Sequence, residues 1–187
     1  MAQWQRLQHP EVEVLSLNLT YSPSNHCPQF RFIFAFMTAL GTPTFENKAK
    51  QHRYDVAYLR MAAEWSKLSH CSRKQVGAII VKNGMIISDG YNGTPAGFDN
   101  CCEDDKGDTH WFVLHAEANA ITKVARSTNN AQDATLYLTL SPCKDCSKLV
   151  LQAGIRRVVF AKLYKDGEGV KLLGDAGIEI EHIEKIG

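Results

Sequence analysis

After its first fifty or so residues, the chain alternates helix-like and strand-like segments, and this order limits the possible folds more than any other feature. Residues 53–68 carry apolar side chains at helical spacing. Residues 76–81 and 85–88 are short apolar segments separated by Asn83 and Gly84. Asn-Gly is the dipeptide favoured in two-residue β-hairpin turns, so these segments predict a helix followed by a β-hairpin.

The rest of the chain continues the alternation in β-α-β units. The pattern predicts helices at residues 113–126, 142–153 and 169–176, and strands at residues 134–140, 156–161 and 178–183. Pro142 stands where proline is favoured, at the first position of its helix. A hairpin followed by β-α-β units indicates an α/β protein in which a mixed sheet lies between layers of helices.

Residues 1–52 differ from the rest of the chain. They contain scattered prolines, little periodicity and one apolar stretch at residues 30–40. That stretch is interrupted by Arg31 and is too short to cross a bilayer, which takes ~20 residues in a helix. It also lies too far from the N-terminus for a signal peptide. We expect a poorly packed extension over residues 1–52, one domain over residues 53–187, and no membrane segment.

The net charge limits the class of binding partner, and the cysteines indicate the cellular compartment. The 21 basic and 20 acidic side chains give a formal net charge of +1, without the basic excess of proteins that bind polymeric nucleic acid. A small phosphorylated substrate is compatible with this charge, since a few local cations suffice. Two of the six cysteines form a C-x-x-C pair, which favours thiolate ligands in a reducing compartment such as the cytoplasm.

Two short motifs carry the chemistry, one starting at His115 (H-A-E) and one ending at Cys146 (P-C-K-D-C). Cys143 and Cys146 are three residues apart and so share one helical face, and His115 can reach them from a neighbouring helix. Three protein ligands leave the fourth tetrahedral position for water, which is the arrangement of a catalytic zinc site. The motifs therefore predict that these three residues bind one catalytic Zn²⁺.

Glu117 is the predicted proton carrier of this site. Glu117 is only two residues after His115, which is too close for it to be a second zinc ligand without strain. It is instead well placed beside a water molecule bound to the zinc. Taken singly, C-x-x-C could be a closed zinc knuckle or a pair of buried thiols, and His115 could be an ordinary core histidine. The two motifs together favour the catalytic interpretation.

H-x-E with a downstream P-C-x-x-C resembles the signature of zinc-dependent nucleobase deaminases. From about residue 53 to the C-terminus, the sequence is similar to the cytidine and deoxycytidylate deaminase superfamily. The resemblance implies a three-layer α/β/α sandwich with a five-stranded mixed sheet. It also implies hydrolytic deamination at a catalytic zinc.

The segment at residues 90–97, G-Y-N-G-T-P-A-G, resembles the loop typical of superfamily members that act on dCMP. Its glycines would let the backbone approach a sugar or phosphate, or would serve only the dihedral angles of a tight loop. The resemblance implies conversion of dCMP to dUMP and ammonia, which feeds dTMP synthesis. Asn92 is the candidate contact to the sugar. Arg126, Arg73 and Lys74 are the candidates for the phosphate, although such cations are more often solvated.

Cys71, Cys101, Cys102 and His110 form a second group in the sequence. Some members that this chain resembles carry a second, structural zinc on loop cysteines and a histidine, and the alternative is a set of free thiols. The resemblance further implies a homo-oligomer, often a hexamer. It implies activation by dCTP and inhibition by dTTP with Mg²⁺.

Two other functions stay open at this point. The first is deamination of another base, such as adenosine in tRNA, guanine or a riboflavin precursor. The loop at residues 90–97 argues against all three, and the balanced charge argues against tRNA. The second is a non-catalytic, zinc-stabilised binding protein of the same fold. Glu117 would be useless to a structural site and so argues against that function.

Overall fold

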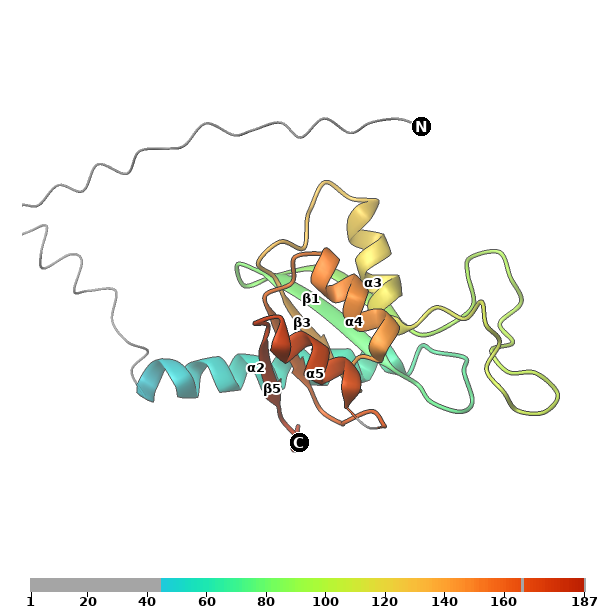
Figure 1. Ribbon diagram of the computed structural model, residues 1–187, viewed down its shortest axis with the longest axis horizontal. Coiled ribbons are helices and arrows are strands. Elements are labelled where there is room, and N and C mark those ends of the chain that lie inside the picture. The colour runs from blue at the N-terminus through green and yellow to red at the C-terminus, as the bar shows by residue number, and fades with distance from the viewer. Residues whose placement is uncertain (1–44, 166, 187) are drawn as a thin grey trace, which may run out of the picture. The chain divides into compact units, whose positions relative to one another are not determined.

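The computed structural model describes residues 45–165 and 167–186. Their elements, in chain order, are α2 (Phe45–Ser66), β1 (Gly77–Lys82), β2 (Met85–Tyr91), α3 (Ala116–Ala125), β3 (Thr135–Leu138), α4 (Lys144–Gln152), β4 (Arg157–Phe160), α5 (Glu168–Asp175) and β5 (Glu179–His182) (Figure 1). The apolar stretch at residues 30–40, like the rest of residues 1–44, lies outside the described residues. Within the described part of the chain, no helix combines the length and apolarity needed to cross a membrane.

The five strands form one mixed sheet in the order β2-β1-β3-β4-β5. β1 pairs antiparallel with both β2 and β3, whereas β3, β4 and β5 are parallel. The β1–β2 turn contains Asn83 at φ 52° and Gly84 at φ 75°, both in the left-handed region that a tight hairpin turn requires. The sheet order confirms the predicted mixed five-stranded α/β fold.

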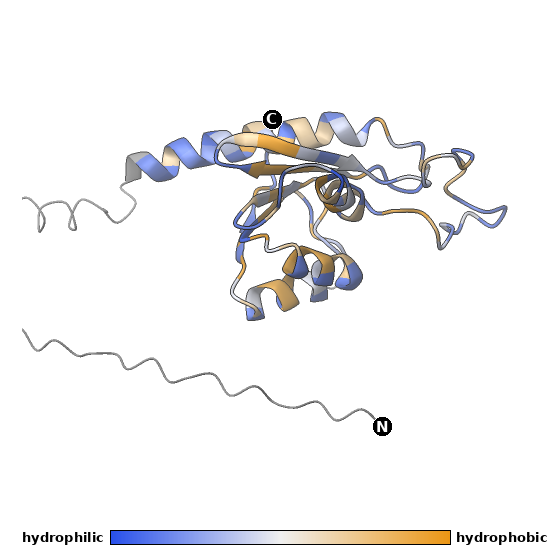
Figure 2. Ribbon diagram, turned by 90° about the horizontal axis from the view of Figure 1, so that it is seen from above, coloured by the Kyte–Doolittle hydropathy of each residue, from blue (hydrophilic) through white to orange (hydrophobic). Residues whose placement is uncertain are grey.

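Helix α2 covers one face of the sheet, and α3, α4 and α5 lie on the other (Figure 2). Alternate residues of β1 enter the two cores, because successive side chains of a strand point to opposite faces. Ile79 packs in the α2 core with Leu59 and Ala62, whereas Ala78 and Ile80 pack in the core on the opposite face. The three layers of the predicted sandwich are thereby confirmed.

A charged network connects α2 to the sheet beneath it. The Asp55 carboxylate, only 2% exposed, accepts two hydrogen bonds from the Arg157 guanidinium, at 2.8 and 3.0 Å. The Tyr137 hydroxyl donates a third, at 2.8 Å. Buried charges are tolerated when they are paired and hydrogen-bonded, so this network specifies how α2 lies across β3 and β4.

Several element boundaries differ from the sequence-based expectation, and three helix starts bear on the domain and the site. Helix α2 begins at Phe45, so the domain boundary predicted between residues 52 and 53 falls inside a helix. Residues 47–54 are all exposed, and an exposed helical turn carries no apolar periodicity that could reveal it. Helix α3 begins at Ala116 after an extended His115, and α4 begins at Lys144 after an extended Cys143. Pro142 therefore precedes the cap of α4 and is not its first helical residue.

Candidate catalytic metal centre

The three predicted zinc ligands meet at the N-terminal ends of two helices. His115 caps α3, Cys143 caps α4, and Cys146 lies in the first turn of α4. His115 Nδ1 is 3.4 Å from Cys143 Sγ and 3.3 Å from Cys146 Sγ. All three ligand atoms lie within 4.8 Å of one another. A tetrahedral zinc with Zn–S of ~2.3 Å and Zn–N of ~2.0–2.1 Å requires sulfur and nitrogen about 3.5 Å apart, so these residues fit the ion.

The electrostatics of this group favour a bound cation. Hydrogen bonds from Cys146 and His115 lower the pKa of Cys143 to about 3, which makes its sulfur a thiolate. The hydrogen bond to Cys143, together with burial, raises the pKa of the Cys146 thiol. A bound Zn²⁺ deprotonates a coordinating thiol outright, and the positive ends of α3 and α4 also stabilise negative charge at this point. The donor set is therefore suited to Zn²⁺ with two thiolates.

Glu117 lies in the first turn of α3 and is only 4% exposed. Burial raises its pKa to about 7, while the nearby His115 opposes the shift. A carboxyl group with a pKa near neutrality can both accept and return a proton. A purely structural zinc site has no use for such a group, so the site has the composition of a catalytic centre.

A cavity of about 260 Å³ opens beside Glu117 and the zinc ligands. The metal end contains His115, Glu117 and Cys143. The remaining walls come from the segment before β1, the loops after β2, the start of α3, and the segments that follow β3 and β4. They comprise Cys71, Arg73, Lys74, Val76, Asn92, Glu103, Thr109, Val113, Ala116, Leu140, Ser141, Tyr164 and Lys165. The cavity thus adjoins both Glu117 and the possible metal ligands.

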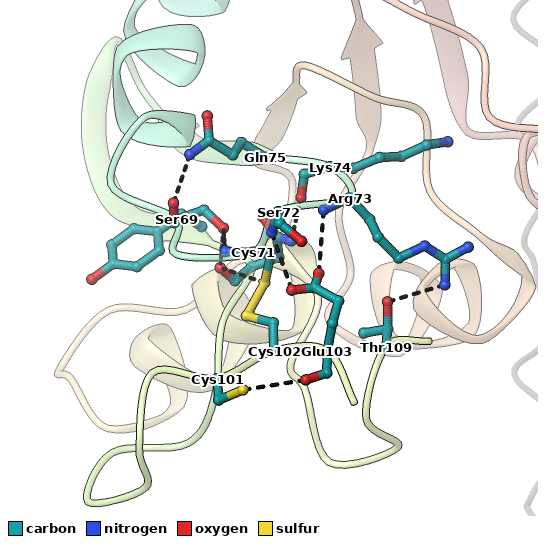
Figure 3. The surroundings of a disulfide bond; sticks show 12 residues. Ser69, Cys71, Ser72, Arg73, Lys74, Gln75, Cys101, Cys102, Glu103 and Thr109 are labelled. Atoms are coloured by element: carbon teal, nitrogen blue, oxygen red, sulfur yellow. Dashed lines mark hydrogen bonds between the residues drawn. A yellow bond between two sulfur atoms is a disulfide. The ribbon is translucent and has the colours of Figure 1, made fainter. Parts of the chain in front are cut away.

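Three of the four predicted substrate contacts line this cavity. The Asn92 side chain accepts a hydrogen bond from the Val76 amide and donates one to the Lys74 carbonyl. It thereby holds the segment before β1, and one amide hydrogen is left for a ligand. Arg73 and Lys74 extend from that segment to the same side (Figure 3). Arg73 Nη1 is already engaged, 3.6 Å from Asp108 and 3.4 Å from the Thr109 hydroxyl.

The fourth predicted contact, Arg126, lies along a different cavity. It follows the last residue of α3, and at a rise of ~1.5 Å per residue the helix carries it about 13 Å from Glu117. The second cavity, of about 460 Å³, also contains Tyr91 and Lys123. Much of its wall is the loop at residues 93–98, which includes most of the G-Y-N-G-x-P-x-G segment. The structure thus separates Arg126 from the metal centre.

The predicted second zinc group is arranged differently from a metal site. Cys71 and Cys102 form a disulfide (Figure 3), and disulfide sulfurs lack the thiolate charge that binds zinc. The exposed Cys101 donates a hydrogen bond to the Glu103 carbonyl, and the His110 ring stacks on Phe112. Among the described residues, only the catalytic group brings three metal-ligating side chains together.

Several cavity residues were not anticipated from the sequence, chiefly Ser141, Tyr164 and Lys165. Ser141 lies just beyond β3, and Tyr164 and Lys165 lie beyond the adjacent parallel strand β4. Ligands of open α/β sheets bind outside the carboxyl ends of the strands. Their position directly after a predicted strand of a β-α-β unit was therefore the sequence signal that could have identified these residues as part of a ligand site.

Comparisons with known proteins agree with this geometry. Residues 52–162 match the family described as the cytidine and deoxycytidylate deaminase zinc-binding region. The deoxycytidylate deaminase of Enterobacteria phage T4 is 36% identical over 170 residues, covering 68% of this chain and 88% of the phage protein. The dCMP deaminase of cyanophage S-TIM5, solved with dCMP and dUMP, is 45% identical with a TM-score of 0.69, over 70% of this chain and 97% of that one.

A deaminase of another substrate class is also similar, but less so. The Thermotoga maritima diaminohydroxyphosphoribosylaminopyrimidine deaminase/reductase is 26% identical with a TM-score of 0.58, over 71% of this chain and 37% of that protein. The match to the family model covers both motifs that meet at the metal centre. The chain belongs to the cytidine and deoxycytidylate deaminase family, and His115, Cys143 and Cys146 are the residues of its zinc-binding region that can hold the ion.

Proposed function

We propose that this protein is an enzyme that hydrolyses dCMP to dUMP and ammonia. The observation that carries the proposal is the buried Glu117 beside three side chains arranged for zinc. The substrate assignment is supported by relatives named deoxycytidylate deaminase, at 36% identity over most of the phage T4 protein. It is also supported by 45% identity to a structure solved with dCMP and dUMP.

The reaction exchanges the amino group on C4 of cytosine for an oxygen atom of water. A Zn²⁺ ion held by His115, Cys143 and Cys146 would lower the pKa of water at its fourth position towards ~7. Glu117 accepts a proton from the attacking water and delivers it to N3 of the ring. It then transfers the second water proton to the departing amino group, which leaves as ammonia when the C4–N4 bond breaks. A pKa of about 7 suits Glu117 to both directions of transfer.

The assay that tests this function compares ammonia release from dCMP, CMP, deoxycytidine and dCTP. We expect dCMP to exceed deoxycytidine by at least ~10²-fold in kcat/KM, because a phosphate-binding site loses ~1–3 kcal/mol for each donor left unpaired. Equal rates on nucleoside and nucleotide would contradict the dCMP assignment but not the deaminase. Release from none of the four would contradict cytosine deamination, and the same assay with guanine, adenosine and a riboflavin precursor would test the other substrates.

The second cavity supports an allosteric part of the proposal. We infer that nucleotide effectors, dCTP and dTTP with Mg²⁺, bind there in a homo-oligomer such as a hexamer. Arg126 supplies positive charge, as does Lys123, whose ammonium also pairs with Asp89 at 2.7 Å. The glycine-containing loop at residues 93–97 permits close approach of phosphates. Arg126 would then act in regulation. Its replacement by alanine is expected to change the response to dCTP and dTTP more than the unregulated rate on dCMP.

A second, structural zinc is also part of the proposal. We place the enzyme in the cytoplasm, where its product would feed dTMP synthesis. Thiols stay reduced in that compartment. Cys102 lies beside His110, whose amide donates a hydrogen bond to the Cys102 carbonyl at 2.9 Å. Reduced Cys71 and Cys102 would then be available to bind zinc with His110 and Cys101, the other two residues of the predicted group. Metal analysis under reducing conditions should give about two equivalents of zinc, falling to about one in Cys102→Ser. An unchanged metal content in that variant would exclude the second site.

A further inference from the structure

One wall of the catalytic cavity is formed by a stretch of chain that belongs to neither a helix nor a strand. This wall segment, residues 71–76, lies between α2 and β1. It contributes four residues to the cavity lining, Cys71, Arg73, Lys74 and Val76. We propose that Glu103 is a positioning residue for the substrate, which holds the wall segment in place and takes no part in the chemistry. This inference rests on the proposed function and assigns that reaction a further residue.

The backbone of the wall segment is held by two side chains. Backbone amides outside helices and strands need other hydrogen-bond partners. The Glu103 carboxylate accepts one hydrogen bond at each oxygen, from the Ser72 amide at 3.1 Å and from the Arg73 amide at 3.3 Å (Figure 3). Asn92 holds the following part of the segment through one carbonyl and one amide. The position of this wall therefore depends on these two side chains.

Glu103 also determines the surroundings of the Arg73 side chain. The backbone of Glu103 pairs with that of Thr109 in an antiparallel bridge. The turn between these two residues is closed by the Asp104 carboxylate, which accepts hydrogen bonds from two backbone amides. The Thr109 hydroxyl in turn accepts a hydrogen bond from Arg73 Nη1 at 3.4 Å. Glu103 thus contacts the amide of Arg73 directly and places a partner beside its guanidinium.

The charge of Glu103 favours this indirect role. Burial opposes ionisation of its carboxyl group, but hydrogen bonds from Ser72 and Arg73 outweigh burial and lower the pKa below its usual value. An ionised carboxylate accepts amide hydrogen bonds more strongly than a neutral group does. The same negative charge would repel the phosphate of dCMP at close range. Glu103 therefore acts on the substrate through the wall segment.

The neighbouring Cys71–Cys102 bond does not make Glu103 redundant. That bond attaches the loop to the first residue of the wall segment, whereas the amides bound by Glu103 belong to the next two residues. Each residue beyond a single cross-link keeps two soft dihedral angles. The backbone at Ser72 and Arg73 would therefore be free to turn without the carboxylate, whether the two cysteines are bonded or reduced.

The test measures kcat and KM for dCMP separately in the zinc-loaded enzyme and its variants. Glu103→Ala should raise KM about 10-fold, because two hydrogen bonds to a charged group are lost. It should leave kcat nearly unchanged, since the residues around the metal are untouched. Glu103→Gln, which keeps one acceptor oxygen, should give an intermediate KM. Asp105→Ala removes an exposed acidic residue from the same loop, and as the matched control it should change neither value.

Amide hydrogen exchange measures the same contact without turnover. The Ser72 and Arg73 amides should exchange at least about 10-fold faster in Glu103→Ala than in the wild type. The amide of Ile80, which lies in β1 between two paired strands, should keep its protection in both proteins. Faster exchange throughout the protein would instead indicate a general loss of stability and would contradict a local positioning role.

The possible outcomes separate the role of Glu103 from the proposed function. A lower KM in Glu103→Gln and Glu103→Ala would show that repulsion of the substrate dominates, and an unchanged KM would show that the contact has no effect on binding. Either result overturns the positioning role. A wild type that does not deaminate dCMP would instead overturn the proposed function, and equilibrium dialysis with dCMP then decides the role of Glu103. Weaker binding to Glu103→Ala than to the wild type supports it, and equal binding or none to both overturns it.

Discussion

His115 Nδ1 lies 3.3 Å from Cys146 Sγ, although the two residues are 31 positions apart and belong to different helices. Their meeting depends on the parallel strands β3 and β4, with α4 between them, and on the packing of α3 beside α4. The caps of both helices face one point, so the histidine, the two thiols and Glu117 share a single site. The following predictions test how that site works and what holds it together.

Glu117→Gln should leave the fold and bound zinc intact and abolish nearly all turnover. The amide has similar size but cannot transfer protons, and general acid–base groups contribute ~10²–10⁴-fold to rate. The measurement is kcat on dCMP at saturation, together with zinc content. Near-normal kcat in a zinc-replete variant would remove Glu117 from the mechanism.

Cys143→Ala and Cys146→Ala should each lose the catalytic zinc and activity together. Each variant leaves two of three protein ligands, and metal affinity supports the folded state as well. Both variants should therefore also unfold at a lower temperature than the zinc-loaded wild type. Removing zinc from the wild type with a chelator should abolish activity, and added Zn²⁺ should restore it. Full zinc occupancy of the catalytic group in either alanine variant would contradict the ligand assignment.

Gly90→Ala should destabilise the protein and weaken its zinc site. A Cβ on Gly90 would collide with the Ala116 carbonyl oxygen and lie 2.7 Å from the Ala120 amide, so α3 would have to move with its cap His115. Overpacking of this kind costs ~1–3 kcal/mol of unfolding free energy. Urea denaturation measures that cost, and competition with a chelating dye measures the zinc affinity.

The control for this change is Gly174→Ala, at a helical glycine on α5 with no neighbouring atom within 4 Å. Removing a glycine from a helix should leave stability unchanged or raise it by up to ~1 kcal/mol. If Gly90→Ala behaved like Gly174→Ala, the close approach of α3 to β2 would have no energetic significance.

The Asp55–Arg157 pair should make stability depend on pH in the acid range. Burial alone would raise the pKa of Asp55, but hydrogen bonds from Arg157, Gln51 and Tyr137 outweigh it and lower the pKa below its usual value. A lowered folded-state pKa contributes stability above the unfolded pKa of ~3.9, and this contribution is lost as the pH falls through the folded value. Asp55→Asn should cost ~3–5 kcal/mol at pH 7, because it leaves the Arg157 charge poorly paired.

Urea unfolding at several pH values between about 3 and 7 measures this effect. The loss of stability on acidification should be smaller in Asp55→Asn than in the wild type. Glu181→Gln is the control, since Glu181 is half-exposed and 4.0 Å from Arg157, and exposed pairs contribute ~0–1 kcal/mol. Parallel pH profiles for Asp55→Asn and the wild type would show that Asp55 does not contribute.

The sequence alone determined the features that depend on short spacings. Asn83-Gly84 predicts the hairpin because few dipeptides tolerate two left-handed dihedral angles in succession. The spacing of three residues between Cys143 and Cys146 predicts that both thiols meet at the start of one helix, and the structure places one at the cap of α4 and the other in its first turn. The order of helices and strands predicted the layered α/β fold, because buried parallel strands need helices on both faces. None of these inferences requires knowing which distant residues meet.

Tertiary packing alone decided the contents of the cavity. Arg126 is close to Glu117 in the sequence, yet the length of α3 carries it to another cavity. Tyr164 and Lys165 are far from Lys74 in the sequence. The sheet order nevertheless places the ammonium groups of both lysines beside the Tyr164 ring. Local spacing is set by backbone geometry and can be read along the chain. Proximity between residues that are distant in the sequence depends on how the faces of helices and sheet pack together. The sequence around any one residue does not specify that packing.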